Sequence, residues 1–293
     1  MRRKQDTLTA WLFLAPAIII FLVLIVYPIF MSGYASFTKW KFTSGLKGMK
    51  WYGFKNYTNI FEDLNFKAAI RNTFLYVFTT VPVSILLSLI FAFLLNNKVY
   101  IAKTLRLFYF IPYIANAVAI ATLFSTWFRN DGMVNNILSL FSKEPVMLKW
   151  MSDKSLCKIP IMFMLVWTSL GYLIIIYMGA LQNVSIDLYE AAEIDGASKT
   201  QQFIHITFPL VSQTTFYLLI VRMIAVFKVF VSVNVMSMRS PAKWNTSIMV
   251  EVYSAAFSSM QFGKACAEAW ILVLIVLFFT AVQFIGQKKW VHY

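Results

Sequence analysis

The sequence reads Leu188-Tyr-Glu-Ala-Ala-Glu-Ile-Asp-Gly-Ala197 and continues to Pro209 as a polar stretch between two strongly apolar segments. Two pairs of residues have the spacing of a helix N-cap and its reciprocal capping partner: Asp187 with Glu190, and Ser198 with Gln201. The stretch therefore predicts two short helices. The second rejoins an apolar helix at Pro209, because proline is tolerated in the first helical turn.

A glycine and several alanines leave the backbone of this polar stretch thinly covered. Gly196 lies between the two predicted helices, where a left-handed helix end is easiest to form. So short a pair of helices cannot bury a core of its own, whereas small side chains let another surface approach closely. Small and acidic residues alternate here, which predicts a docking element: Glu190, Ala191, Ala192, Glu193, Asp195, Gly196 and Ala197.

The composition is that of a membrane protein. Of 293 residues, 60% are hydrophobic and 13% are charged, about half the charged fraction of a soluble protein. A helix needs about 20 apolar residues to cross the hydrocarbon. Six charge-poor windows are long enough: about Trp11–Met31, Asn72–Leu95, Leu105–Phe128, Ile159–Gln182, Phe208–Ser232 and Ala267–Ile285. We expect one all-α polytopic domain over residues 1–293 with six transmembrane helices, the first of them a retained helix rather than a cleaved signal.

Basic residues are spread over the predicted loops and tails. The net charge is +14, but nucleic-acid binding would concentrate lysine and arginine on one face, so contact with anionic lipid headgroups is the favoured interpretation. The tails, Arg2-Arg-Lys4 and Lys288-Lys289, and the basic segment Lys98–Arg106 indicate that both termini are cytoplasmic. The count of basic residues over all loops does not favour this orientation.

Polar residues inside the predicted spans are informative, because burying them in hydrocarbon is costly unless they face a cavity or a partner. Arg222 and Lys228 lie in the fifth span, and Glu268 lies at the outer end of the sixth. We expect either an ion pair between Lys228 and Glu268 or a Lys228 side chain that extends alone to the interface. In the fourth span, Trp167-Thr-Ser-Leu-Gly-Tyr172 has the small and hydroxyl residues of either helix packing or a substrate contact.

Catalytic and cofactor motifs are absent from the sequence. It has no phosphate-binding Gly-x-x-x-x-Gly-Lys-Ser/Thr loop. His205 and His292 have no acid and nucleophile in a plausible triad, and Cys157 and Cys266 have no metal-ligand spacing. We expect no enzyme activity, cofactor or metal. Active transport by this chain would need an ion gradient or another polypeptide.

The polar stretch resembles the cytoplasmic EAA loop of permease subunits in bacterial binding-protein-dependent ABC importers. Glu190-Ala-Ala-x-x-Asp-Gly-Ala, followed by Phe203, Ile206 and Pro209, carries the resemblance. Other segments are similar to the MalF/UgpA-type sugar permease branch: Gly53-Phe-Lys-Asn-Tyr57, Asn72-Thr73, Lys103-Thr-Leu-Arg106 with Pro112, Gly132-x-Val-Asn135 and Phe227-Lys-Val-Phe230. The resemblance covers nearly the whole chain.

This resemblance implies a MetI-like, type I ABC importer permease fold in the bacterial plasma membrane. It implies a second permease subunit, two ATP-binding subunits, an extracellular solute-binding lipoprotein and a carbohydrate substrate. Residues 187–208 would be the cytoplasmic coupling loop, with Glu190, Ala191, Ala192, Asp195 and Gly196 at the ATPase contact. The substrate pathway implied by the resemblance contains Trp167, Ser169, Gly171, Tyr172, Lys228 and Asn234.

A gradient-driven secondary transporter or channel is the alternative. Such proteins often contain internal repeats, and none is evident in this sequence. The identity of the sugar is left open, because aromatic residues have many uses in a membrane protein.

Overall fold

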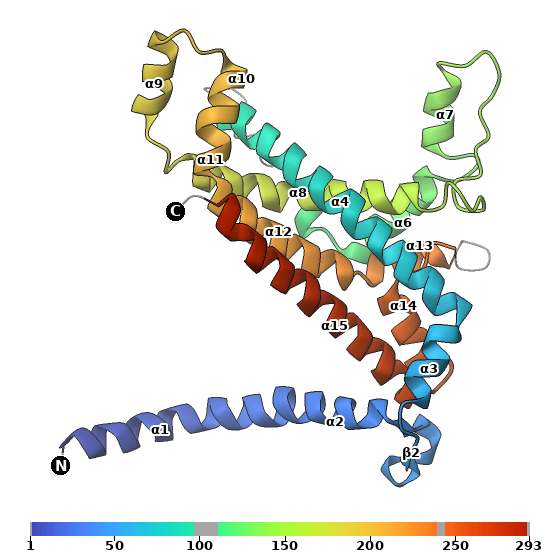
Figure 1. Ribbon diagram of the computed structural model, residues 1–293. Helices are drawn as coiled ribbons and strands as arrows, with labels where there is room; N and C mark the ends of the chain where they lie inside the picture. Colours follow the sequence, from blue (N-terminus) through green and yellow to red (C-terminus); the bar gives the residue numbers. More distant parts are fainter. Residues whose placement is uncertain (1, 97–110, 239–243, 292–293) are drawn as a thin grey trace. The chain divides into compact units, whose positions relative to one another are not determined.

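In a computed structural model of the protein, the described residues are 2–96, 111–238 and 244–291 (Figure 1). Within these ranges the regular structure is helical apart from one two-stranded sheet, so the predicted all-α class is confirmed. The chain divides into two compact units, Met1–Leu64 with Glu251–Val273, and Asn65–Val250 with Leu274–Tyr293. The predicted single transmembrane domain stays a prediction.

The first unit begins with a long apolar helix. Its parts are α1 (Arg2–Phe21), the π-helical η1 (Leu22–Val26) and α2 (Tyr27–Ser36). The apolar window of this helix, within Trp11–Ser36, has no buried residue, and the Phe13 side chain is 83% exposed. Because water would make so apolar a surface unfavourable, the helix is suited to lipid or to another chain.

A small hairpin and a short helix follow. Strand β1 (Thr38–Lys39) pairs antiparallel with β2 (Lys50–Trp51), and Thr38 lies opposite Trp51. The 3-10 turns η2 (Phe42–Ser44) and η3 (Leu46–Gly48) connect the strands, and α3 (Lys55–Glu62) comes next. The buried Asn56 side chain fixes the hairpin to the end of α2, because its amide donates to the carbonyls of Ser36 at 2.8 Å and Thr38 at 2.9 Å.

The start of α15 (Phe262–Gly286) completes the first unit. A Cβ on Gly263 would lie 2.0 Å from the Thr38 carbonyl oxygen, so only glycine allows this approach. Lys264 pairs with Asp63 at 2.6 Å and lies 3.7 Å from the buried Glu268. Glu268 thus has a cationic neighbour one turn away. Lys228 belongs to the second unit, and its pairing with Glu268 stays a prediction.

The second unit is built from helices of very different lengths. It holds α4 (Leu64–Asn96) from its second residue, α6 (Ala117–Trp127), α7 (Met133–Ser139), α8 (Ile159–Leu181), α9 (Ile186–Ile194), α10 (Lys199–Gln202), the π-helical η4 (Phe203–Thr207), α11 (Phe208–Leu210), α12 (Ser212–Phe227), α13 (Val231–Ser237), the first half of α14 (Ile248–Tyr253), the rest of α15 and η7 (Gln287–Lys289). The π-helical η6 (Ser254–Ser258) follows α14. Helix α8 packs on α6 and α12, and α13 packs on α6 and α8.

Five of the six predicted spans are confirmed as helices of spanning length and apolarity. They run over Trp11–Ser36, Leu64–Leu95, Ile159–Leu181, Ser212–Ser237 and Phe262–Gly286. The remaining predicted span, Leu105–Phe128, begins outside the described residues, as does the basic segment Lys98–Arg106. Its described part is not one continuous helix. The chain breaks at Ala115 and Asn116, and the Asn116 side chain caps α6 by accepting from the N–H groups of Val118 and Ala119.

Buried asparagines hold the irregular segments of the second unit. Asn72 on α4 donates to the carbonyls of Trp244 at 2.8 Å and Thr246 at 3.0 Å, and Tyr76 one turn later donates to Asn245 at 2.7 Å. Without these donors the carbonyls would be left unsatisfied in a site closed to water. The segment that precedes α14 is therefore fixed to α4.

Replacing Asn72 with alanine should destabilise the protein. Loss of each hydrogen bond to a buried carbonyl costs about 1–3 kcal/mol. We therefore expect a clear fall in the melting temperature of the detergent-solubilised protein, measured by size-exclusion chromatography of heated samples. Asn136, on α7, has an exposed side chain and provides the control Asn136→Ala. Equal melting temperatures for the two variants would contradict the assignment.

Candidate coupling loop and membrane cavity

The loop between α8 and α12 begins with a capped helix. Ser185, not the predicted Asp187, is the N-cap of α9, and its hydroxyl accepts from the Asp187 N–H at 3.2 Å. Asp187 instead lies in the first turn, where its negative charge is favourable near the positive end of the helix dipole.

Gly196 ends α9 in the left-handed conformation that the sequence predicts. Its φ angle is +76°. The Gly196 N–H donates to Glu193 at 3.1 Å, and the Ala197 N–H donates to Ala192 at 2.8 Å. These two bonds form a Schellman motif, which satisfies the last carbonyls of the helix and requires a positive φ at this position. The glycine is needed for its backbone angle rather than for space, because a Cβ here would have no atom within 4 Å.

The second short helix, α10, has the predicted capping box. The Ser198 N–H donates to the Gln201 side chain at 2.7 Å, and the Gln201 N–H donates to the Ser198 hydroxyl at 3.3 Å. Lys199 on this helix pairs with Glu193 on α9. The hydrogen bond from Lys199 lowers the pKa of the Glu193 carboxyl from its ordinary value, so the pair stays charged at neutral pH.

Two contacts fix the loop to the helices behind it. The Tyr189 hydroxyl of α9 lies 2.9 Å from the hydroxyl of Thr207, which is fully buried in η4. The Phe203 ring of η4 packs near-perpendicularly on the Phe93 ring of α4, with 5.2 Å between ring centroids. A displacement of α9 would therefore also displace η4 and the end of α4.

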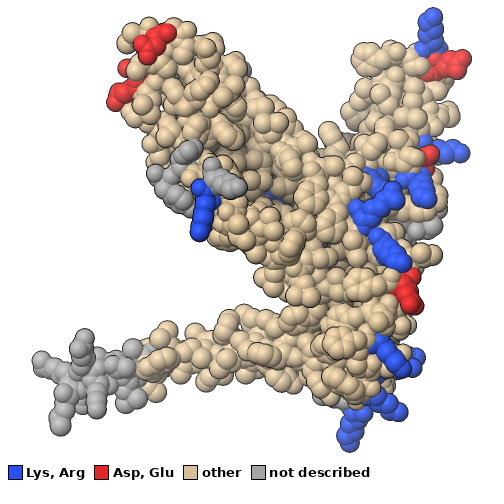
Figure 2. Space-filling model, viewed as in Figure 1, with Lys and Arg blue, Asp and Glu red and all other residues tan. Residues whose placement is uncertain are grey.

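The outer face of α9 is both acidic and apolar. Glu190, Ala191, Asp195 and Gly196 are exposed and Ala192 is half-buried, while the Ile194 side chain is 87% exposed. Figure 2 shows acidic side chains gathered over this part of the molecule. Exposed isoleucine beside small residues is unfavourable in water and suits a surface that another protein covers. The structure thus brings the predicted coupling residues together on one accessible helix and its glycine turn.

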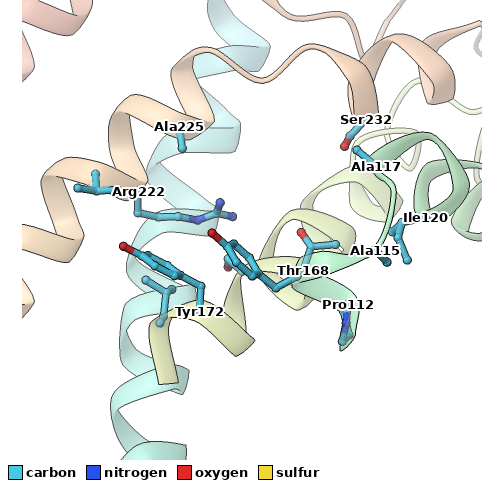
Figure 3. Close-up of a pocket in the computed structure, with 13 residues that line it drawn as sticks. Pro112, Ala115, Ala117, Ile120, Thr168, Tyr172, Arg222, Ala225 and Ser232 are labelled. Carbon is cyan, nitrogen blue, oxygen red and sulfur yellow. The ribbon is translucent and has the colours of Figure 1, made fainter. Parts of the chain in front are cut away.

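A cavity of about 390 Å³ lies within the second unit (Figure 3). Residues of α6, α8, α12, α13 and the segment before α6 form its walls: Pro112, Tyr113, Ala115, Ala117, Ile120, Thr168, Ser169, Tyr172, Leu173, Val221, Arg222, Ala225 and Ser232. Its size is in the range of about 300–1,000 Å³ that is usual for small-molecule sites.

Aromatic and hydroxyl side chains give the cavity its chemical character. The rings of Tyr113 and Tyr172 are stacked, with centroids 5.2 Å apart and planes 20° apart. Thr168, Ser169 and Ser232 add hydroxyl groups to the wall. The Ser169 hydroxyl also donates to the Ser84 hydroxyl at 3.1 Å, which holds α8 against α4.

Arg222 brings a positive charge to the same cavity. Its guanidinium Nη2 donates to the Leu165 carbonyl, and its Nε is buried without a hydrogen-bond partner. Figure 3 shows the side chains of Arg222 and Tyr172 extending from α12 and α8 toward the same space. The position of Arg222 within a predicted span made it informative in the sequence. The sequence did not show that Arg222 lines the same cavity as Tyr113 and Tyr172.

The predicted substrate-pathway residues separate into two groups. Ser169 and Tyr172 line the cavity. Trp167 packs on the Phe124 ring, Gly171 is buried in α8, Lys228 is the exposed C-cap of α12, and Asn234 lies on α13. These last residues are not among the cavity-lining residues, and their assignment to the pathway stays a prediction.

Residues 72–291 match the family model described as the inner membrane component of binding-protein-dependent transport systems. The chain belongs to this family. The match includes α8, the candidate coupling loop and α12, and it confirms the resemblance to this family drawn from the sequence. With several helices long and apolar enough to span a bilayer, this inner membrane component is a multi-pass membrane protein.

Relatives of this family component are similar over almost their whole length. The chain is 30% identical to the lactose transport system permease protein LacF of Rhizobium radiobacter, covering 99% of this chain and 97% of that protein. It is 31% identical to the sulfoquinovosyl glycerol transport system permease protein SmoG of Agrobacterium fabrum, covering 94% and 89%. It also shares the fold of a chain in a bacterial ABC transporter involved in import of the acidic polysaccharide alginate, with a TM-score of 0.83, 22% identity and 99% of both chains covered.

Replacing Gly196 with alanine should loosen α9. An L-residue in the left-handed conformation costs roughly 1–2 kcal/mol, so amide hydrogens of residues 186–197 should exchange about 5 to 30 times faster. The matched control is Gly179→Ala, because Gly179 lies in α8 with no positive φ and open space around its Cβ position. Unchanged exchange in Gly196→Ala would contradict the strained-turn assignment.

Proposed function

We propose that this chain is one of two permease subunits of an ATP-driven importer for carbohydrates, and that residues 187–208 form its contact with the ATPase. The observation that carries the proposal is the exposed surface of α9 and Gly196. It combines acidic residues, small residues and an uncovered isoleucine on a helix too short to be stable without packing. A surface groove on a partner protein would cover this helix.

A carbohydrate substrate is supported by the walls of the cavity. The stacked rings of Tyr113 and Tyr172 offer a flat apolar face to a sugar ring, and the nearby hydroxyl groups offer hydrogen bonds to sugar hydroxyls. LacF and SmoG are both named as permeases for sugar-containing compounds, which favours the same substrate class here.

The complete transporter would contain a second, similar permease, two ATP-binding subunits and an external binding protein. The family description names binding-protein dependence directly. The long apolar helix of the first unit, with its exposed surface, provides area for a second permease or for lipid. On this proposal both termini and the coupling loop are on the cytoplasmic side, where ATP is available.

The proposed mechanism is mechanical. Closure of the ATPase subunits on ATP would displace α9, and the contacts of Tyr189 with Thr207 and of Phe203 with Phe93 would pass the displacement to the spanning helices. The cavity would then open alternately to the two sides. The chain itself would bind no nucleotide.

Two substitutions in the loop test the coupling. In Glu190→Lys, the reversed charge opposes docking, and in Gly196→Pro, the fixed negative φ of proline prevents the left-handed turn. We expect ATPase activity stimulated by the loaded binding protein, and sugar uptake into proteoliposomes, to fall by about tenfold or more in each, since an unfavourable charge or geometry in an interface costs several kcal/mol.

The control for the charge reversal is Glu144→Lys, an exposed acidic residue in the segment after α7. All variants should insert and co-purify with the second permease. Normal uptake by both loop variants would refute the coupling role. Uptake by the purified chain alone, without nucleotide, would instead support a secondary transporter.

A further inference from the structure

The cavity contains a positive charge with no opposite charge in its walls. Among its lining residues only Arg222 is charged. Within the described part of the chain, the ion pairs involve Arg129, Lys199 and Lys264, and none involves Arg222. Arg222 is half-buried and its Nε is fully buried, and partial removal of a guanidinium from water is unfavourable without a partner of opposite charge. The site therefore favours a negatively charged group.

The geometry of Arg222 leaves part of its hydrogen-bonding capacity unsatisfied. One terminal nitrogen, Nη2, donates to the Leu165 carbonyl, which holds the side chain in place between α12 and α8. The Nε group is buried without a partner. Arginine presents five N–H donors in a planar fork, which matches the two oxygens of a carboxylate better than a single hydroxyl oxygen.

A neutral sugar would use the aromatic wall but would leave this charge uncompensated. Sugar hydroxyls can accept from the guanidinium, yet they bring no charge to offset its removal from water. A sugar acid uses the aromatic wall and also compensates the positive charge, because its ring can lie against Tyr113 or Tyr172 while its carboxylate accepts hydrogen bonds from Arg222.

We propose that the cavity selects an acidic carbohydrate, a sugar that carries a carboxylate or a similar oxyanion, and that Arg222 is the residue that recognises the anion. This inference rests on the proposed carbohydrate permease and narrows its substrate class. Tyr113 and Tyr172 contribute to binding of any sugar, whereas Arg222 discriminates between acid and neutral forms.

The test compares each acid with its own neutral form. The probes are disaccharides of glucuronic, galacturonic and mannuronic acid and their methyl esters, titrated by calorimetry into this chain co-purified with its second permease in lipid nanodiscs. We expect at least one acid to bind about tenfold or more tightly than its ester, because a hydrogen bond to a charged group is stronger than one between neutral groups.

Substitution of Arg222 assigns the preference to this residue. Arg222→Gln should reduce the preference for the acid to about twofold or less while leaving affinity for the ester nearly unchanged. Arg222→Lys should retain part of the preference, since it keeps the charge and loses the planar fork. Lys154→Gln removes an exposed positive charge outside the cavity lining, in the segment before α8, and should leave the preference intact.

The possible outcomes separate this inference from the proposed function. If the acid and ester bind the unsubstituted protein equally, or if Arg222→Gln keeps the preference, the cavity does not select acids, although the carbohydrate permease stands. If no sugar of either form binds, the selection of acids is contradicted, whereas the carbohydrate permease is judged separately by the uptake experiment in proteoliposomes. The comparison of acid with ester needs no variant, so it decides the question even if Arg222→Gln fails to assemble.

Discussion

Hydrogen bonds from buried side chains to backbone carbonyls are the interaction on which the irregular parts of this membrane protein depend. A helix satisfies its own backbone, but a buried loop or helix break leaves carbonyls that need donors from elsewhere. Asn72 and Tyr76 supply the missing donors to the segment before α14, and Asn56 does so for the hairpin of the first unit. Asn135, after the turn that begins α7, donates in the same way to the carbonyls of Asn130 and Leu148, each at 2.9 Å.

Local rules predicted the structure of the candidate coupling loop well, because that structure is determined by neighbouring residues. The capping box of Ser198 with Gln201 and the left-handed Gly196 both follow from spacing and residue type alone. The first N-cap was predicted wrongly, because Ser185 and Asp187 are both good capping residues and the sequence does not say which the chain uses. The same rules, applied to Asn116, would have found the break before α6, but a hydropathy window averages over such a residue.

Long-range packing determined the cavity, and the sequence predicted less of it. Ser169 and Tyr172 were predicted because the resemblance to sugar permeases implied a substrate pathway in this part of α8, and both line the cavity. Tyr113 gave no such signal, because tyrosine is frequent near membrane interfaces and its stacking on Tyr172 depends on how α8 and the segment before α6 pack together. Arg222 was recognised as unusual, but its position in the cavity depends on its contact with the Leu165 carbonyl on another helix.

The two helices that flank the loop in the chain also line the cavity. Helix α8 carries Tyr172 and leads into the loop, while α12 leaves the loop and carries Arg222. At 1.5 Å per residue, Tyr172 is about 14 Å from the end of α8, and Arg222 is about 15 Å from the start of α12.

Between the loop and the cavity, the Tyr177 hydroxyl of α8 donates to the Thr215 hydroxyl of α12 at 3.0 Å, and both residues are buried. This bond ties the two helices together, so a displacement of the loop moves them as a pair. Tyr172 lies on α8 and Arg222 on α12. Such a displacement would therefore shift the two cavity walls that these helices form relative to Tyr113, which lies before α6. On the proposed mechanism, the stacked contact between Tyr113 and Tyr172 is therefore the one that movement of the loop would open.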